Sequence, residues 1–280
     1  MTTIPSGTVS IAPASGLSLA AVAELFNAVY EGYALPMHVD AGTIAFMFDA
    51  YDLAAEPSCV ASLDGQPVGL AMLGMRGSRG WVGGMGVRLP ARRRGIGEQL
   101  MLALISNARA SGLTTLGLEV LEPNTSARAL YEKLGFLTTR RLEVLDLATA
   151  VPPTGMLAHA VAPHEAHARI TSHRTAPEPW QRDDDTLARL DVSTPALRGL
   201  TTSGGDVVYR VADGRASILQ MTATSETSAG VLLDTIRSRT GVQSVRFLNV
   251  PEDDVCAQAM RSRGATLLVA QLEMELRWAP

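Results

Sequence analysis

The hydrophobic positions of residues 8–147 alternate between strand spacing and helical spacing, which predicts an α/β fold of the mixed α+β kind. Behind Ser18, a residue type that caps helices well, Val22 and Leu25 begin the apolar face of a first predicted helix. The predicted order is strand, two helices, three strands, helix, strand, helix and strand, over residues 8–13, 18–30, 41–51, 58–63, 68–75, 81–89, 95–110, 115–121, 125–134 and 136–147. Short turns between the three central strands favour a mixed, mostly antiparallel sheet flanked by helices.

The second half of the chain follows a similar order more faintly. Its predicted strands and helices cover residues 207–211, 216–222, 228–239, 244–249, 252–263 and 266 onward. Between the halves, residues 148–175 are rich in Ala, Pro and His, and Val151-Pro152-Pro153 indicates a break in the sheet. We therefore expect two domains, 1–150 and 151–280, and the second is a degenerate repeat of the first.

Composition narrows the class of protein. The 280 residues carry 24 basic and 28 acidic side chains, and a net charge of −4 gives no excess of positive charge for a nucleic-acid partner. Cys59 and Cys256 are the only cysteines and lack the spacing of a disulfide framework or a paired metal site. No secretory leader or membrane-length apolar run occurs. We expect a soluble cytoplasmic protein with no metal and no membrane partner.

The strongest chemical signal is a predicted strand that ends in an arginine- and glycine-rich loop and then opens a helix, over residues 87–100. Unpaired backbone N–H groups and the positive end of the helix dipole meet in such a loop, and arginines add charge, so the loop is typical of an anion site. A solvated run of arginines before an ordinary helix is the alternative. The pattern has neither the Gly-Lys-Ser/Thr ending of an ATP-binding loop nor the parallel first strand of a dinucleotide fold.

The segment Arg92-Arg93-Arg94-Gly95-Ile96-Gly97 resembles the Arg/Gln-x-x-Gly-x-Gly/Ala loop by which GNAT acetyltransferases hold acetyl-coenzyme A. A second segment, Leu118 to Asn124 continuing through Tyr131 to Phe136, resembles the strand and helix that follow in that superfamily. The resemblance covers roughly residues 8–147. It implies a catalytic GNAT domain that binds acetyl-coenzyme A, followed by a degenerate GNAT-like domain.

The resemblance also implies residue roles at the coenzyme site. Backbone amides from Arg93 to Glu98 would bind the pyrophosphate, and the strand before the loop would hydrogen-bond the pantetheine arm where two parallel strands splay apart. The implied coenzyme-binding residues are Met85, Gly86, Val87, Arg92, Arg93, Arg94, Gly95, Ile96, Gly97, Glu98, Asn124 and Tyr131. Asn124 either contacts the coenzyme arm or only caps its helix.

Amine acylation needs a neutral nucleophile and protonation of a departing thiolate. Tyr131 stands seven residues after Asn124, as does the tyrosine that many GNAT enzymes present to the coenzyme sulfur, so the resemblance implies the acid; packing alone is the alternative. Glu119 is the preferred base, because its strand neighbours should face the opposite side. Glu31, Glu122 or a water relay are alternatives.

The loop with Glu31 and Tyr33 lies where GNAT proteins shape the acceptor pocket, so both are candidate substrate-binding residues. The predicted function is transfer of an acyl group from acetyl-coenzyme A to a primary amine of a small molecule or a protein terminus. A non-catalytic acyl-coenzyme A sensor is the alternative. In the second half, residues 222–227 replace the arginine and glycine loop, so no second coenzyme site is expected. Either a monomer with pseudo-dimeric domains or a homodimer is compatible with this organisation.

Overall fold

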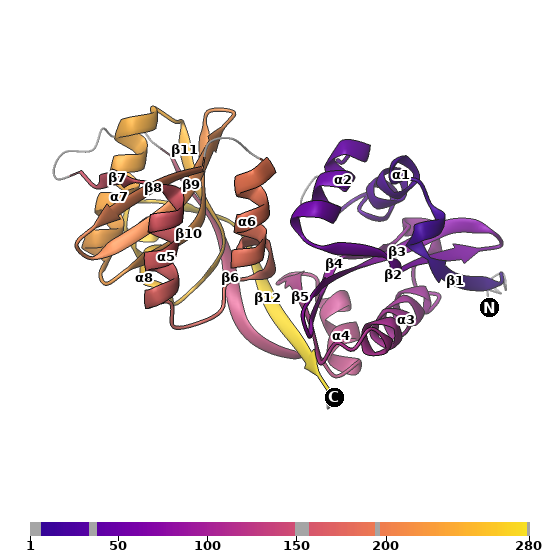
Figure 1. Cartoon of the computed structure of the whole chain (residues 1–280). Coiled ribbons are helices and arrows are strands. Elements are labelled where there is room, and N and C mark those ends of the chain that lie inside the picture. Colours follow the sequence, from indigo (N-terminus) through magenta and orange to yellow (C-terminus); the bar gives the residue numbers. More distant parts are fainter. Residues whose placement is uncertain (1–6, 34–37, 149–156, 194–196, 279–280) are drawn as a thin grey trace. The chain divides into compact units, whose positions relative to one another are not determined.

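The computed structural model describes residues 7–33, 38–148, 157–193 and 197–278. The chain forms two compact units (Figure 1). The first comprises Met1–Val120, Asn124–Thr139 and Met274–Pro280, and the second comprises Leu121–Pro123 and Arg140–Glu273. The chain therefore enters the second unit at Arg140 and returns to the first at Met274, and the predicted boundary near residue 150 lies outside the described residues.

The first unit contains the elements that the hydrophobic pattern predicts. They are β1 (Val9–Pro13), α1 (Leu19–Val29), α2 (Ala41–Ala50), β2 (Leu53–Leu63), β3 (Gln66–Arg76), β4 (Arg79–Val87), α3 (Ile96–Ala110), β5 (Thr115–Leu121), α4 (Thr125–Lys133) and the start of β6 (Leu137–Ala148). Strands β1 to β4 form an antiparallel meander, and β5 pairs with β4 in parallel. The sheet is mixed and mostly antiparallel, as predicted.

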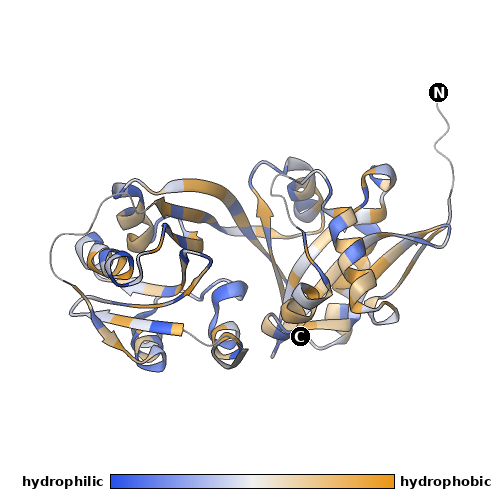
Figure 2. Ribbon diagram, turned by 90° about the horizontal axis from the view of Figure 1, so that it is seen from above, coloured by the Kyte–Doolittle hydropathy of each residue, from blue (hydrophilic) through white to orange (hydrophobic). Residues whose placement is uncertain are grey.

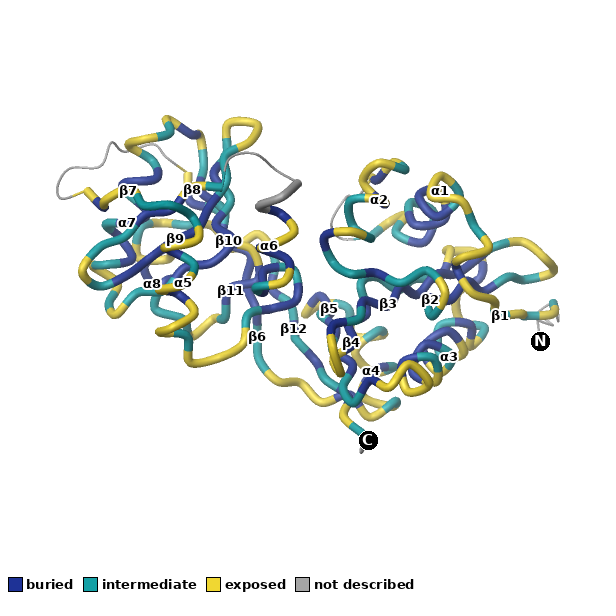
Figure 3. Tube along the Cα trace, in the orientation of Figure 1, coloured by how far each residue is buried: buried dark blue, intermediate teal, exposed yellow. Residues whose placement is uncertain are grey.

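Helices cover both faces of this sheet, with α1 and α2 on one face and α3 and α4 on the other (Figure 1). The Ser18 hydroxyl accepts the Ala21 amide and caps α1, as the sequence predicts. Leu100 and Leu104 of α3 are fully buried, whereas the turns between the strands and the outer faces of the helices are exposed (Figure 3). Hydrophobic residues run along the strands and the inner helix faces (Figure 2), so burial of these positions holds the layers together.

The second unit repeats the same strand order. Its elements are β7 (His159–Val161), α5 (Pro163–His173), α6 (Asp184–Ser193), β8 (Leu197–Thr202), β9 (Gly205–Ala212), β10 (Arg215–Ala223), α7 (Glu226–Thr240), β11 (Ser244–Pro251), α8 (Val255–Ser262) and β12 (Thr266–Arg277). Strands β7 to β10 are antiparallel neighbours, and β10 and β11 pair in parallel. The prediction of two sheet-and-helix domains of one kind is confirmed.

The two repeats exchange their last strands. In the second unit, β11 pairs antiparallel with β6, which comes from the first half of the chain. In the first unit, the neighbour of β5 is β12, the last strand, and the backbone N–H of Trp278 donates to the carbonyl of Thr114 (3.1 Å). Each unit is therefore completed by a strand that follows the other unit's helices in sequence.

The hydrophobic pattern missed two regions of the second unit, one of which is strand β8. Residues 157–175 were read as part of a connecting segment, but they form β7 and α5. Only Ala166 and Ile170 of α5 are buried, and the rest of the helix is polar apart from Pro163 and Ala168. Two small apolar contacts on a polar helix leave little periodicity for a sequence pattern to reveal.

Candidate active site

A cavity of about 280 Å³ opens in the first unit where β4 and β5 separate. Their parallel pairing ends at Trp81 and Gly117, and β4 carries one extra residue, Gly83, opposite β3. A β-bulge bends its strand and turns it from its neighbour. Beyond the bulge, the residues from Gly84 to Val87 on β4 and from Leu118 to Val120 on β5 line the cavity.

Close packing on both sides of β4 explains two of its glycines. A Cβ atom on Gly86 would lie 2.9 Å from Val29 Cγ2, and one on Gly83 would lie 2.5 Å from Leu53 Cδ2. Such distances are too short for non-bonded carbon atoms. Glycine at Gly86 therefore lets α1 approach the strand that forms one wall of the cavity, and glycine at Gly83 leaves room for Leu53 of β2.

The loop between β4 and α3 presents free backbone N–H groups at the end of the cavity. Arg93 (φ +65°) and Gly95 (φ +76°) adopt the left-handed conformation, and the first helical hydrogen bond runs from Gln99 N–H to Gly95 O (3.1 Å). In the described parts of the chain, the backbone N–H groups of residues 93–98 have no acceptor. Alternating left-handed residues before a helix make a concave anion site.

The charged side chains of this loop divide into different roles. The Arg92 guanidinium donates to the carbonyls of Val87 (2.7 Å) and Val29 (3.0 Å), so it fastens the loop to α1 and β4. Arg93 is exposed and lines the cavity, whereas Arg94 does not. Glu98 is also absent from the lining, and its carboxylate pairs with Lys133 (2.6 Å).

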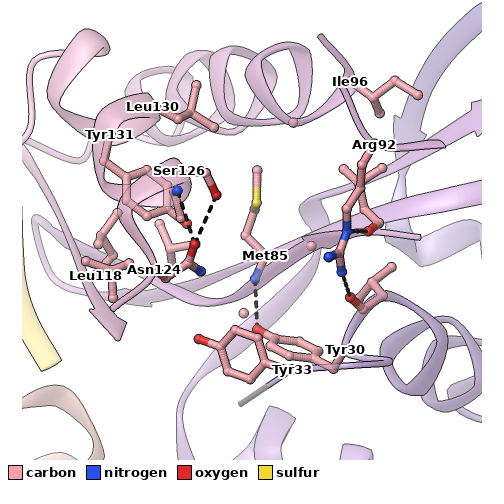
Figure 4. A pocket seen from close by; sticks show the side chains of 18 of the residues that line it. Tyr30, Tyr33, Met85, Arg92, Ile96, Leu118, Asn124, Ser126, Leu130 and Tyr131 are labelled. Carbon is pink, nitrogen blue, oxygen red and sulfur yellow. Dashed lines mark hydrogen bonds between the residues drawn. The ribbon is translucent and has the colours of Figure 1, made fainter. Parts of the chain in front are cut away.

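Tyr131 of α4 lies in the cavity wall (Figure 4). Its ring is buried and tilted against Phe136, with ring centroids 5.8 Å apart. None of the described residues forms a hydrogen bond with its hydroxyl. Burial raises the pKa of Tyr131 above the usual tyrosine value, and the neighbouring Tyr30 and Tyr33 raise it further. The phenol is therefore protonated at neutral pH and is available to donate.

Asn124 and Tyr33 lie beside Tyr131 in the same cavity. The Asn124 carboxamide oxygen accepts the Ala127 amide (3.3 Å) and so caps α4, while the residue also lines the cavity. Burial raises the pKa of Tyr33, and the side chain of Asn124 offsets part of that rise. Glu31 is exposed and is not part of the cavity lining.

Glu119 of β5 faces the cavity, and Trp81 holds its carboxylate: the indole N–H donates to Oε2 (2.8 Å). Trp81 pairs in parallel register with Gly117, so Glu119 stands two residues further along β5 on the same face. The sequence analysis did not assign Trp81 a role at the site. Register between two parallel strands, which only the structure supplies, brings these two residues together.

Tyr30, also not predicted as a site residue, contacts the strand predicted to bind the coenzyme arm. Its hydroxyl accepts the backbone N–H of Met85 (3.2 Å), directly beyond the bulge (Figure 4). Its ring packs on Phe26 and Tyr33, with centroid distances of 4.5 and 5.1 Å. Burial raises its pKa well above the usual range. The protein thus places its own hydroxyl on the Met85 amide.

In the second unit, an arginine fills the corresponding separation of strands. Parallel pairing of β10 and β11 ends at Ile218 and Phe247, with Leu219 as the bulged residue. The buried Arg182 guanidinium donates to the carbonyls of Leu219 (3.0 Å) and Asn249 (3.1 Å), one on each strand. It also lies over the Phe247 ring, 4.6 Å from the centroid.

Two of the four histidines in residues 157–175 have structural partners. His167 contacts the Asp184 carboxylate (2.8 Å), and His173 contacts the Arg169 carbonyl (2.9 Å). Within the described ranges, no group of three His, Cys, Asp or Glu side chains is placed to hold a metal ion. Among these residues there is also no helix long and apolar enough to cross a membrane.

Solved structures with the same fold cover nearly the whole chain. A GCN5-related N-acetyltransferase from Sphaerobacter thermophilus is 16% identical with a TM-score of 0.75, over 97% of this chain and 96% of that one. A tandem GNAT protein from the clavulanic acid biosynthesis pathway is 17% identical with a TM-score of 0.64, over 98% and 99%. A GCN5-related N-acetyltransferase from Kribbella flavida is 15% identical with a TM-score of 0.60, over 96% and 71%. These similarities define a GNAT fold with two domains in one chain.

Comparison with protein-family models gives a match for the first half of the chain. Residues 20–136 match the model of the acetyltransferase (GNAT) family, and this range contains the whole candidate site from Tyr30 to Tyr131. No curated protein matches the chain. The chain therefore has a two-domain GNAT fold, and its residues 20–136 match the GNAT acetyltransferase family.

Proposed function

We propose that this protein is an acetyl-coenzyme A-dependent N-acetyltransferase, with donor and catalytic residues in the first unit. One observation carries the proposal: the free amides of residues 93–98, the unpaired edges of β4 and β5, and the buried Tyr131 hydroxyl converge on one cavity. A phosphate group suits the amides, and an extended amide-bearing chain suits the strand edges. The family match supports the same donor.

The loop is shaped for a donor that approaches the main chain closely. Gly97 stands in the first turn of α3, and a Cβ atom there would lie 3.2 Å from Met85 Cε, so a larger residue would crowd the cleft. Arg93 supplies charge at the phosphate end, while Arg92 holds the loop in place. The residues from Met85 to Val87 offer main-chain groups to the pantetheine arm. Arg94 and Glu98 would contribute to the donor site through their backbone N–H groups, not through their side chains.

Acetyl-coenzyme A supplies a thioester that a neutral amine attacks directly and a thiolate that must be protonated on leaving. Tyr131 is the proposed acid, because its buried phenol is protonated and faces the cavity. Glu119 is the proposed base. Its hydrogen bond from Trp81 holds the carboxylate at the cavity, where it would take a proton from the amine directly or through water.

The acceptor is a primary amine of a small molecule or a protein terminus. Tyr33 lines the cavity and is the proposed acceptor contact within it, whereas Glu31 would act from outside, at the mouth. We further propose one donor per chain. Arg182 already satisfies carbonyls on both separated strands of the second unit, so an extended ligand finds no free edge there.

Thiol release from acetyl-coenzyme A, measured across amines, amino acids and peptide amino termini, tests this proposal. Tyr131→Phe should lower the rate by about 10²–10⁴-fold, the usual contribution of a general acid. Glu119→Gln should lower it and flatten the acid limb of the pH profile. Tyr209→Phe, a buried tyrosine of the second unit, is the matched control and should retain the rate.

Binding without turnover separates the alternatives. If calorimetry shows one coenzyme per chain but no amine supports thiol release, a non-catalytic acyl-coenzyme A sensor replaces the enzyme. If the Tyr131→Phe rate equals that of wild type, Tyr131 is not the acid. If the coenzyme does not bind, or if Gly97→Val leaves its affinity unchanged, the proposed donor site is wrong.

A further inference from the structure

The second unit contains a cavity of about 150 Å³ that has no counterpart in the proposed reaction. Its lining residues come from the C-terminal part of α5, the β8–β9 hairpin and the end of β10. Most of the residues that line it are charged or polar, among them Asp206, Arg169, His173 and Thr222. All of these residues belong to the second unit.

Asp206 on β9 is the unusual member of this set. The residue is only 5% exposed, and its Oδ1 atom is buried without a hydrogen-bond partner among the described residues. A buried carboxylate oxygen without a partner is costly, because it has lost water and gained no hydrogen bond in return. A charge in this state at a cavity wall points to a cationic group that binds there.

An opposite charge stands on the same cavity. Arg169 of α5 is exposed at the cavity, and its guanidinium forms no ion pair with Asp206 or with another carboxylate of the described residues. Its backbone carbonyl accepts the Nδ1–H of His173 (2.9 Å), which fixes the imidazole and leaves Nε2 free to accept a hydrogen bond. A negative and a positive side chain therefore line one small cavity without neutralising each other.

We propose that this cavity binds a small zwitterion of the amino-acid type, with its ammonium group on Asp206 and its carboxylate on Arg169. Such a ligand gives each of the two side chains a charged hydrogen-bond partner of opposite sign. At about 30 Å³ for each water-sized group, the cavity holds roughly five non-hydrogen atoms, the size of glycine. Selection for small zwitterions follows from charge and volume together.

Thermal unfolding of the full chain tests the proposal with three probes at matched pH and ionic strength. Glycine carries both charges, ethylamine only the ammonium and acetate only the carboxylate. Glycine should raise the midpoint temperature in a saturable way, because a ligand that binds only the folded state stabilises it. Ethylamine should require at least tenfold more, and acetate should give no saturable shift.

Asp206→Asn keeps the side-chain shape and removes the charge. It should abolish the glycine shift, and it should also raise the midpoint of the ligand-free protein, since no unpaired buried charge remains. Asp213→Asn, at an exposed turn of the same unit, is the matched control and should leave both values unchanged. Arg169→Gln should weaken glycine binding and leave ethylamine binding as it was.

Each contrary result overturns a defined part of the proposal. No glycine shift at tens of millimolar excludes a zwitterion site. A shift that survives Asp206→Asn places glycine elsewhere, such as the amine acceptor site of the first unit. Equal potency of ethylamine and glycine excludes the pairing of a ligand carboxylate with Arg169.

Discussion

Replacing Arg182 by methionine should destabilise the second unit strongly. The guanidinium is 2% exposed, pairs with Glu178 at 2.8 Å and donates to carbonyls on β10 and β11. Methionine fills similar space, so the loss is mainly electrostatic. It leaves the Glu178 carboxylate, itself only 12% exposed, without its nearest cation, and two carbonyls lose a donor. Breaking a buried pair in this way costs about 3–5 kcal/mol of unfolding free energy.

Hydrogen exchange resolved by mass spectrometry shows in which of the two units the unfolding free energy has fallen. Amides of β10 and β11 should exchange faster in Arg182→Met, while amides of β2 and β3 should not change. The control is Arg128→Met, which breaks a 2.7 Å pair with Glu132 in which both side chains are about half exposed. That change should cost about 0.3–0.5 kcal/mol.

A second variant separates the charge from the packing. Arg182→Met combined with Glu178→Met removes both charges, so much of the lost stability should return. A loss in Arg182→Met no larger than that in Arg128→Met would refute the argument that Arg182 holds the separated strands. Failure of the double variant to recover would show that packing on Phe247 dominates instead.

Three further predictions concern the first unit. Tyr30→Phe frees the Met85 amide and keeps the ring, so donor affinity measured by calorimetry should rise about 2–10-fold, the value of one hydrogen bond; weaker binding would show that the hydroxyl assists the donor. Gly86→Ala should cost about 1–3 kcal/mol in urea unfolding through its contact with Val29, whereas Gly16→Ala, in open space, should cost little. Burial raises the pKa of Cys59 to about 11, so alkylation in the folded protein should stay slow until the pH approaches that value; rapid reaction at pH 8 would contradict this.

The order of elements in the first unit could be predicted because each has a local signal. Ser18 caps α1, Gly95 precedes α3, and apolar residues repeat at the period of each element. The exchange of β6 and β12 could not be predicted, since either strand could complete either sheet as far as its own residues are concerned. Strand pairing of this kind is decided by contacts far apart in sequence.

The candidate site was predictable where its residues are close in sequence. The loop from Arg92 to Gly97 and the position of Tyr131 follow from local motifs, and the structure brings both to one cavity. The contacts of Trp81 with Glu119 and of Tyr30 with Met85 depend on register and on helix placement. The role of Arg182 could not be predicted for the same reason, because it lies far before β10 and β11 in the sequence and only the fold brings it between them.

The strand exchange imposes an order on biosynthesis. The sheet of the first unit is completed only by residues from Met274 onward, which leave the ribosome after the entire second unit. At about 5 to 20 residues per second, the edge of β5 waits roughly 7 to 27 seconds for its neighbour after Thr139 has been made. During that time the nascent chain exposes an unpaired strand edge, the kind of surface that chaperones shield and that other chains can join. Messages with slow codons between the two repeats would lengthen this exposure.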